Sequence, residues 1–356
     1  MLKKDLKKDI SVTVFLFRRL FFNRIARLFF LFIFVFAIFP IILFFIIRPK
    51  IQANINYGVN FSDKYATDLG LDWKTSYIEI LDGLNVKNIR LVVYWNDVEK
   101  VNDEFDFSNI KWQLDEAEKK NLNVILATGR KAPRYPECHE PLWWRESADK
   151  KLKEIELYEF IKKSIQELKS YNSIKIWQVE NEPFFPFGEC EKSESRVIQD
   201  EVEIVRSLDA RPILIQDSGE GGFWFPSYEM ADYLGISMYR KIWYDFWKIF
   251  FGRFIYFQYP LAHWSYKIKA DLFNVPYQNI IVTELQSEPW GPSINSKLSQ
   301  IEKDKTMSRI DFLETINYAQ KAGFKDIYFW GVEWWLWEKN VNNNSYFWDT
   351  GKALFN

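Results

Sequence analysis

Two glutamates, Glu182 and Glu284, are the side chains of this sequence whose type and setting best suit chemistry. Glu182 belongs to the tripeptide Asn181-Glu182-Pro183, which directly follows an apolar run, and Glu284 ends a second apolar run. Two carboxyl groups that face one pocket can divide the work of breaking a glycosidic bond. One protonates the leaving oxygen, while the other attacks the sugar or activates water.

Several other acidic residues stand close to the same kind of position and compete for these roles. They are Glu180, Asp217, Glu220, Glu288 and Glu333. Glu180 is the strongest competitor, because it lies two residues before Glu182 and would share its side of an ideal strand. A single glutamate at a strand end is more often a solvated residue or an ion-pair partner, so the hypothesis depends on the pair.

The elements that must position this pair follow from the hydrophobic pattern. Eight short apolar runs, several of them continuous as in parallel strands covered on both faces, alternate with amphipathic helical stretches. The expected strands are 55–61, 89–94, 123–128, 174–180, 212–216, 233–238, 279–284 and 326–330. The clearest expected helices are 110–120, 152–171, 196–208 and 308–321.

Eight strands with intervening helices predict an α/β fold, a (β/α)8 TIM barrel over residues 55–356. An open doubly wound sheet is the alternative, but the first strand-to-helix turn, at 58–62, has no G-x-G-x-x-G nucleotide motif. Active sites of such barrels lie at the C-terminal ends of the strands. Glu182 after strand four and Glu284 on strand seven would therefore face each other across the barrel mouth.

Residues 54–356 resemble the clan A retaining glycoside hydrolases, which have (β/α)8 barrels, and within them the cellulase-like family 5 and its relatives. The residues that carry the resemblance are Asn181-Glu182-Pro183, Glu284, Arg90 in strand two, Tyr239 after strand six and Trp330 at the end of strand eight. The tripeptide has little specificity by itself. Its position on strand four of eight, together with a strand seven that ends in glutamate, makes the resemblance specific.

The resemblance implies a role for each matching residue. Glu182 would be the acid/base and Glu284 the nucleophile. Asn181 would hold the sugar 2-hydroxyl, while Arg90 and Tyr239 would hydrogen-bond the nucleophile and lower its pKa. Glu182 must begin protonated, and the nearby charge of Glu284 favours this.

The sequence departs from family 5 at two places. Ser237 stands where family 5 enzymes usually have a histidine, two positions before the strand-six tyrosine. The histidine expected near the end of strand three is replaced by Gly129-Arg130-Lys131. The two-glutamate mechanism does not depend on these positions, but no family 5 substrate is carried over.

Tryptophan is abundant at the expected strand ends, which favours a sugar ligand because indoles stack on the apolar faces of sugar rings. The tryptophans at or just after strand ends are Trp95, Trp143, Trp144, Trp290, Trp330, Trp334, Trp335 and Trp337. By the resemblance, Trp330 would form the floor of the −1 subsite. Trp290, Trp95 and Trp334 are further candidate substrate-binding residues.

The two cysteines and two histidines limit the possible metal and cofactor chemistry. Cys138 and Cys190 fall in the loops after strands three and four, where they form either a disulfide bracing the cleft, given an oxidising compartment, or two free thiols. His139 is expected to form hydrogen bonds in the cleft, and His263 to be structural. We therefore predict neither a metal ion nor a cofactor.

The N-terminal region reads as a membrane anchor. Residues 28–47 form an uncharged run of about the length that spans a bilayer. The leader 1–27 is strongly basic, and residues 48–54 form a short tether to the barrel domain. The positive-inside rule places the N-terminus in the cytoplasm and the barrel on the extracytoplasmic side of a single-pass protein. A cleaved signal peptide is the alternative.

An aromatic insertion at 240–260 and the end of the chain lie outside the regular barrel pattern. The insertion is expected to be a helical hairpin packed on the barrel, a lid over the cleft, or a surface resting on the membrane. After strand eight only 346–355 is expected to form a helix.

The charge distribution separates the barrel domain from the leader. Residues 1–50 carry ten basic and two acidic side chains, so the remaining 306 residues carry a net charge of −9 against −1 for the whole chain. An acidic domain disfavours nucleic acid as a partner. We expect a membrane-anchored retaining glycosidase that acts on a β-linked oligo- or polysaccharide. The alternatives are an inactive glycan-binding barrel, a transglycosylase that remodels envelope glycans, and a metal-dependent hydrolase.

Overall fold

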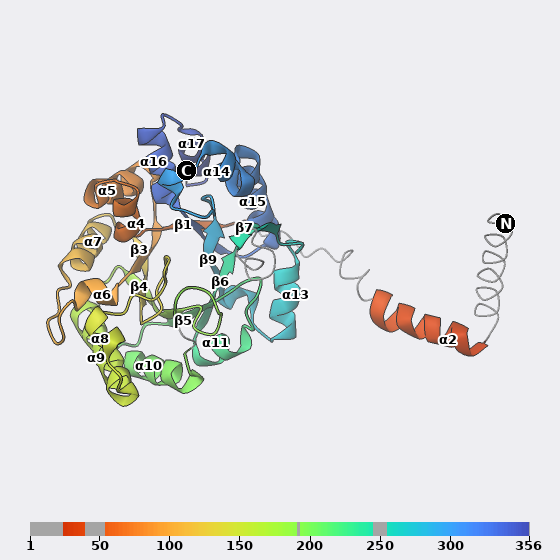
Figure 1. Ribbon diagram of the computed structural model, residues 1–356, viewed down its shortest axis with the longest axis horizontal. Helices are drawn as coiled ribbons and strands as arrows, with labels where there is room; N and C mark the ends of the chain where they lie inside the picture. The colour runs from red at the N-terminus through yellow and green to blue at the C-terminus, as the bar shows by residue number, and fades with distance from the viewer. Residues whose placement is uncertain (1–23, 40–53, 191–192, 245–254, 356) are drawn as a thin grey trace, which may run out of the picture. The chain divides into compact units, whose positions relative to one another are not determined.

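The structure is a computed structural model that describes residues 24–39, 54–190, 193–244 and 255–355. The chain divides into two compact units, 1–49 and 50–356, which we describe separately. In the larger unit the strands lie in the middle and the helices surround them (Figure 1).

Eight parallel strands close into a barrel in the order β1-β10-β9-β6-β5-β4-β3-β2, which confirms the predicted (β/α)8 fold. The strands are β1 (Asn56–Asn60), β2 (Asn88–Val92), β3 (Asn123–Thr128), β4 (Ile174–Asn181), β5 (Ile213–Asp217), β6 (Tyr233–Met238), β9 (Ile280–Gln286) and β10 (Asp326–Trp330). Every residue of β5 and β9 is buried. This burial explains why these runs are continuously apolar or uncharged until they reach the mouth of the barrel.

Helices cover the outside of the barrel. They are α4 (Asp63–Asp68), α5 (Trp73–Leu84), α6 (Trp95–Val98), α7 (Ser108–Lys119), α8 (Leu142–Glu146), α9 (Lys150–Leu168), α10 (Ser195–Leu208), α11 (Phe225–Met230), α13 (Ser265–Leu272), α14 (Gln300–Met307), α15 (Arg309–Ala322), α16 (Val332–Val341) and α17 (Tyr346–Lys352). The longest, α9, begins where the Asp149 carboxylate accepts the backbone N–H groups of Lys151 and Leu152. Its buried residues include Leu157, Ile161 and Leu168, which line one helical face.

The expectation of a single helix after the last strand was wrong. Helix α16 precedes α17, and its side chains from Val332 to Glu338 are all buried. The tryptophan-rich sequence of α16 is core rather than surface, since Trp334 packs on Phe347 and Trp335 packs on Phe329. The sequence analysis took these tryptophans as a sign of sugar binding, whereas they belong to a buried helix.

The described part of the aromatic insertion is an antiparallel hairpin, β7 (Lys241–Tyr244) with β8 (Ile255–Gln258), so the expected helical hairpin is not what these residues form. Residues 245–254 of the insertion lie outside the described residues. The strands are rich in isoleucine, tyrosine and phenylalanine, which suits a pleated surface. The Gln286 side chain donates to Lys241 O (2.6 Å) and accepts from Lys241 N (3.1 Å), which fastens the hairpin to β9.

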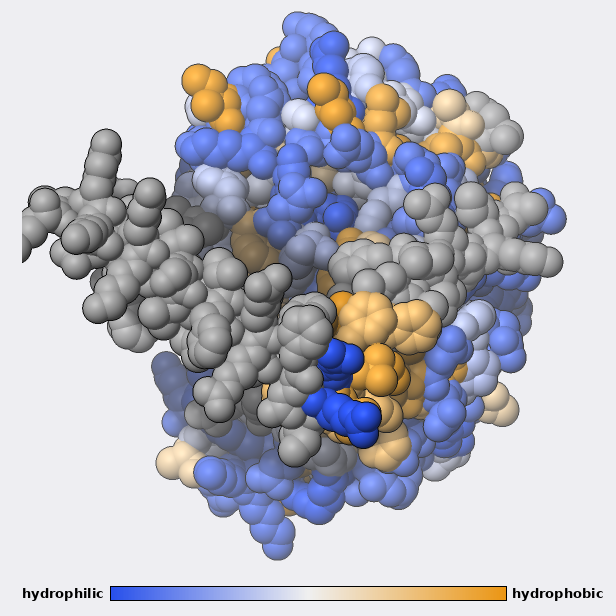
Figure 2. All heavy atoms as spheres, turned by 90° about the vertical axis from the view of Figure 1, so that its right-hand side faces the viewer, coloured by the Kyte–Doolittle hydropathy of each residue, from blue (hydrophilic) through white to orange (hydrophobic). Residues whose placement is uncertain are grey.

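Figure 2 shows the side of the barrel that carries α13, where the surface is mostly hydrophilic, with apolar side chains gathered near the middle and others scattered along the upper part. The hairpin itself exposes aromatic rings, since Tyr244 and Phe257 are each nearly half exposed.

The described part of the N-terminal unit is the helix α2 (Arg24–Ile33), which continues into one π-helical turn, η1 (Phe34–Ile38). Within the described stretch, no helix has the length and apolar character needed to cross a bilayer. Residues 40–47 of the predicted span and 1–23 of the basic leader lie outside the described residues.

Candidate active site

A fully buried guanidinium, that of Arg90 on β2, organises the mouth of the barrel. Its Nη1 donates to Glu284 Oε1 at 2.9 Å, and its Nη2 donates to Asn181 Oδ1 at 2.7 Å. The remaining donors reach three amides, Asn60 (3.0 Å), Gln178 (2.7 Å) and Gln216 (2.6 Å). These bonds compensate the cost of burying the charge and tie the ends of β1, β4, β5 and β9 to β2.

Both carboxylate oxygens of Glu284 have a donor. Arg90 holds Oε1, and the Tyr239 hydroxyl donates to Oε2 at 3.2 Å. Burial, together with the charge of Glu284, raises the pKa of Tyr239 well above its usual value, so the phenol keeps the proton that it donates. An ion pair and a phenol donor suit a carboxylate that must be ionised to attack.

Glu182 lies in a different electrostatic setting. Burial, the Glu137 carboxyl group and the Glu284 carboxyl group raise its pKa well above the usual value for glutamate. The Ser237 hydroxyl donates to Glu182 Oε1 at 2.8 Å. Because Ser237 is the register partner of Glu284 on the neighbouring strand, this bond brings the two glutamates to the same part of the barrel mouth. A glutamic acid that keeps its proton at neutral pH can serve as a general acid.

Glu180, the strongest competitor for the catalytic role, points into a different environment. Its oxygens accept the backbone N–H groups of Arg130 (2.5 Å) and Lys131 (2.8 Å), which ties β4 to the loop after β3. Gly129 has φ +130°, and a Cβ there would lie 2.5 Å from Glu180 Oε1, so glycine is required beside the buried carboxyl group. The structure assigns Glu180 to support of the strand end.

The separation of Glu180 from Glu182 comes from an irregular end of β4. Glu180 has φ +58° and Glu182 has φ +47°, both in the left-handed region. The pairing of β4 with β5 shifts register between Gln178 and Asn181. The alternation of an ideal strand is therefore lost at the point where the active site begins.

The other competing acids are engaged elsewhere. Asp217 accepts from Ser218 N (2.7 Å) and the Ser227 hydroxyl (3.1 Å), and Glu220 accepts from Tyr239 N (2.8 Å). Asp217 is thus held by the segment that follows β5, whereas Glu220 fixes the backbone of Tyr239, the residue whose hydroxyl donates to Glu284.

Glu288 and Glu333 both pair with Arg134, a residue of the loop after β3. The Arg134 guanidinium lies 3.7 Å from the centre of the Tyr65 ring and 4.1 Å from that of Trp330. The ion pairs and the stacking hold this loop across the barrel mouth. Arg134 thus covers part of the indole that the sequence assigned to the −1 floor.

A cleft of about 1090 Å³ lies beside the site and reaches it at Tyr239, the residue that donates to Glu284; neither Glu182 nor Glu284 is among its lining residues. Tyr239, Trp290 and Trp330 line it, together with Glu137 from the loop after β3. Trp290 packs edge-to-face against Tyr239, with ring centres 5.0 Å apart. Aromatic walls with a few polar groups are typical of a site for a polar, ring-shaped ligand.

Two of the four predicted substrate-binding tryptophans lie at this cleft, and two do not. Trp290 and Trp330 line it, whereas Trp95 is fully buried and Trp334 is 1% exposed, both in the hydrophobic core. Trp95 stacks on Phe160, and its Nε1 donates to Glu99 at 2.6 Å. The assignment of Trp95 and Trp334 to sugar binding is therefore corrected, because no ligand can reach a core side chain.

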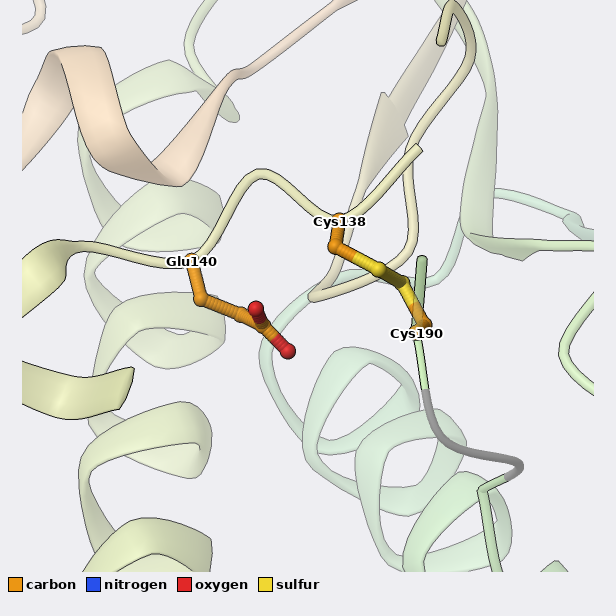
Figure 3. A group of neighbouring side chains, drawn as sticks. All are labelled: Cys138, Glu140 and Cys190. Atoms are coloured by element: carbon orange, nitrogen blue, oxygen red, sulfur yellow. A yellow bond between two sulfur atoms is a disulfide. The ribbon is translucent and has the colours of Figure 1, made fainter. Parts of the chain in front are cut away.

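Cys138 and Cys190 form a disulfide that links the loop after β3 to the loop after β4 (Figure 3). The Glu140 carboxyl group lies beside the two sulfur atoms, and one of its oxygens lies within 4.8 Å of both. Disulfide sulfur atoms are not thiolate ligands, and Glu140 pairs with Arg130 and Arg145. This cluster is therefore a covalent brace for the cleft wall.

Two charged residues of the site, Lys131 and Glu137, were not singled out by the sequence analysis. Lys131 Nζ donates to the carbonyl oxygens of Glu182 (2.8 Å) and Phe185 (3.0 Å), and lies 3.2 Å from Glu137 Oε2. The sequence signals near them were the replacement of the family histidine by Gly129-Arg130-Lys131 and the position of Cys138 in the loop after strand three.

Neither a family model nor a curated protein sequence matches this chain. Solved structures do match it. An exo-β-1,4-mannosidase from Opitutaceae bacterium strain TAV5 aligns with a TM-score of 0.54 at 13% identity, over 86% of this chain and 61% of that one. A GH5_18 enzyme from Streptomyces cattleya, solved with GlcNAc, aligns with a TM-score of 0.53 at 11% identity, over 79% of this chain and 71% of that one. Xylanase 10B from Thermotoga petrophila RKU-1, solved with xylobiose, aligns with a TM-score of 0.51 at 15% identity, over 78% of this chain and 82% of that one.

This chain therefore shares the (β/α)8 barrel fold of these glycoside hydrolases. At 11–15% identity the likeness lies in the fold, so the roles of individual residues rest on the geometry of this site.

Proposed function

We propose that this protein is a retaining glycosidase that cleaves a β-linked glycan by double displacement. The observation that carries the proposal is the contrast between the two glutamates. Arg90 and Tyr239 each donate to one oxygen of Glu284, whereas Glu182 lies in a setting that raises its pKa.

In the first step the Glu284 carboxylate attacks the anomeric carbon while Glu182 gives its proton to the leaving oxygen. The carbon–oxygen bond of the glycoside breaks, and an ester to Glu284 forms. The negative charge of Glu284 disappears in this ester, so Glu182, now ionised, can take a proton from water. Water attacks the anomeric carbon, and Glu284 leaves as a carboxylate.

The cleft supports a glycan as the substrate class. Its aromatic walls, Trp290 and Trp330 among them, offer surfaces for sugar rings. The structural neighbours include an exo-β-1,4-mannosidase, which is named for a β-linked substrate, and a xylanase. An inactive glycan-binding barrel would have no use for the two differently held glutamates.

The membrane anchor at 28–47 remains a proposal that rests on the sequence. It predicts that the full chain sediments with membranes, that carbonate at high pH does not release it, and that protease added outside the cell digests the barrel domain. A barrel released in soluble form, with its N-terminus beyond residue 47, would instead support a cleaved signal peptide.

The test of function uses a panel of aryl β-glycosides with wild-type protein and the variants Glu182→Ala and Glu284→Ala. Each variant is expected to lose at least about 10³-fold in kcat/KM on substrates with poor leaving groups. Azide, a small nucleophile that needs no general base, should rescue both variants with opposite stereochemistry. Glu182→Ala should yield the β-glycosyl azide, and Glu284→Ala should yield the α-anomer. Wild-type rates in both variants would refute the assignment.

A further inference from the structure

The turn that follows β5, residues 218–222, contacts the end of the neighbouring strand β6 at two residues. Gly219 N donates to the Ser237 hydroxyl at 3.2 Å, and Tyr239 N donates to Glu220 Oε1 at 2.8 Å. The side chains of Ser237 and Tyr239 each donate to one glutamate of the proposed catalytic pair. The turn is therefore a shared support for the donors to both reacting groups.

Glu220 reaches the proposed nucleophile through a single residue. Its carboxyl group accepts from the backbone of Tyr239, whose hydroxyl donates to Glu284 Oε2 at 3.2 Å. On the other side of this tyrosine, Arg240 N donates to Gln286 Oε1 on β9 at 2.8 Å. The backbone around Tyr239 is thus held between β5 and β9, and Glu220 is the contact from the β5 side.

The carboxyl group of Glu220 has a fixed position of its own. The Tyr266 hydroxyl, on α13, donates to the same Oε1, and Lys269 Nζ on the same helix donates to Gly219 O at 2.9 Å. A Cβ on Gly219 would lie 1.8 Å from Ser237 O, so only glycine allows the turn to approach β6 this closely. The turn is therefore fixed to α13 on one side and to β6 on the other.

Tyr239 needs the acceptor oxygen of Glu220 and does not need its charge. Burial raises the pKa of Glu220 to about 7, although the hydrogen bonds from Tyr266 and Tyr239 N oppose this. A carboxyl group offers an acceptor oxygen in either protonation state, and so does an amide. Glutamine at this position can therefore keep the contact, whereas alanine cannot.

We propose that Glu220 is a positioning residue for the nucleophile: it holds the backbone of Tyr239 so that the phenol hydroxyl donates to Glu284. This inference rests on the proposed glycosidase function. Glu220 is not among the residues that line the cleft, so its loss should slow the attack by Glu284 and leave substrate binding largely unchanged.

The test is a double-mutant cycle of Glu220→Ala with Tyr239→Phe. It uses an aryl β-glycoside with a poor leaving group, so that attack by Glu284 limits turnover. Glu220→Ala is expected to lower kcat about tenfold, as for one lost hydrogen bond, and to change KM by less than about threefold. Tyr239→Phe removes the hydroxyl through which Glu220 acts, so in that background Glu220→Ala should lower kcat by less than about twofold.

Two further variants distinguish positioning from general loosening of the turn. Glu220→Gln keeps an acceptor for Tyr239 N and should keep kcat within about threefold of wild type. Tyr266→Phe removes the other donor to the same oxygen but leaves Tyr239 bonded, so we expect the same small effect. All rates are measured below the unfolding transition of the least stable variant, so that every protein compared is folded.

Three results would overturn the role of Glu220 and leave the glycosidase assignment intact. They are a wild-type kcat in Glu220→Ala, losses that multiply in the double variant, and a loss in Glu220→Gln or Tyr266→Phe as large as that in Glu220→Ala. Wild-type protein that turns over no β-glycoside would instead overturn the proposed function.

Discussion

The strand ends that form the floor of the site differ from the loops that form its rim. The floor contains Arg90 and Glu284, whose places follow from the order and register of parallel strands, and Glu182, which directly follows the irregular end of β4. The rim contains Arg134 and Glu137, on a loop held by ion pairs, ring stacking and a disulfide. On the proposed function, this difference means that the barrel places the reacting groups and the rim contacts the substrate.

The closest comparison is at the end of β4, between Glu180 in the strand and Glu182 directly after it. Glu182→Gln is expected to lower kcat/KM by about 10³-fold on substrates with poor leaving groups, because the acid is lost. The loss should be smaller on substrates whose leaving group needs no proton. Steady-state kinetics on a leaving-group series measures both effects.

Glu180→Gln should act on stability instead. An amide cannot accept both backbone N–H groups that Glu180 holds, so we expect a loss of about 1–3 kcal/mol in the free energy of unfolding. Denaturant unfolding with both variants measures it. If Glu180→Gln abolished turnover while keeping wild-type stability, the two roles would have to be exchanged.

Removing the disulfide tests whether the rim loops can be loosened without disturbing the catalytic groups of the floor. The double variant Cys138→Ser/Cys190→Ser is expected to lose about 2–4 kcal/mol in the free energy of unfolding, since the bridge closes a long loop. Below the unfolding transition, KM should rise more than kcat falls, because the floor remains in place. A fall in kcat at constant KM would show that the rim takes part in the chemistry.

The buried acids predict how stability depends on pH. Burial raises the pKa of Glu137 to about 8 and those of Glu180, Glu220 and Glu333 to about 7. A carboxyl group whose pKa is higher in the folded state binds more protons when folded, so stability falls as pH rises from 4.5 toward these values. His139, whose pKa burial lowers to about 4, has the opposite effect below pH 6.5.

The clearest window is therefore pH 6.5 to 8, where His139 is neutral in the folded state and at most half protonated in the unfolded state. The Tm should fall by a few degrees across this window, and the fall should be smaller in Glu137→Gln. Thermal unfolding in buffers of constant ionic strength measures it. A Tm that rises across the window would contradict the proton linkage described here.

Ser237→Ala is expected to have the smallest effect. Loss of one hydrogen bond to Glu182 costs about 1 kcal/mol, so kcat/KM should fall by no more than about tenfold. Because Ser237 lowers the pKa of Glu182, the alkaline limb of the pH–rate profile should move to higher pH. A shift to lower pH would be inconsistent with a serine that donates to the ionised carboxylate.

The strands could be predicted from the sequence because parallel strands buried on both faces are continuous apolar runs. Periodicity did not show that Glu180 and Glu182 diverge, because two left-handed residues break the alternation of β4 at its end. Burial of Trp95 and Trp334 could not be read from composition either, since tryptophan suits both a core and a sugar platform. Glu137 depends on the path of an irregular loop, which no periodic pattern describes.

Trapping the covalent intermediate tests the central claim most directly. Wild-type protein incubated with a slow 2-fluoro-β-glycoside, then digested and analysed by peptide mass spectrometry, should carry the sugar as an ester on Glu284 and lose activity in parallel. The label should be absent from Glu284→Gln. A label on Glu182, Glu180 or Glu137, or hydrolysis that gives the α-anomer as the first product, would contradict the assignment.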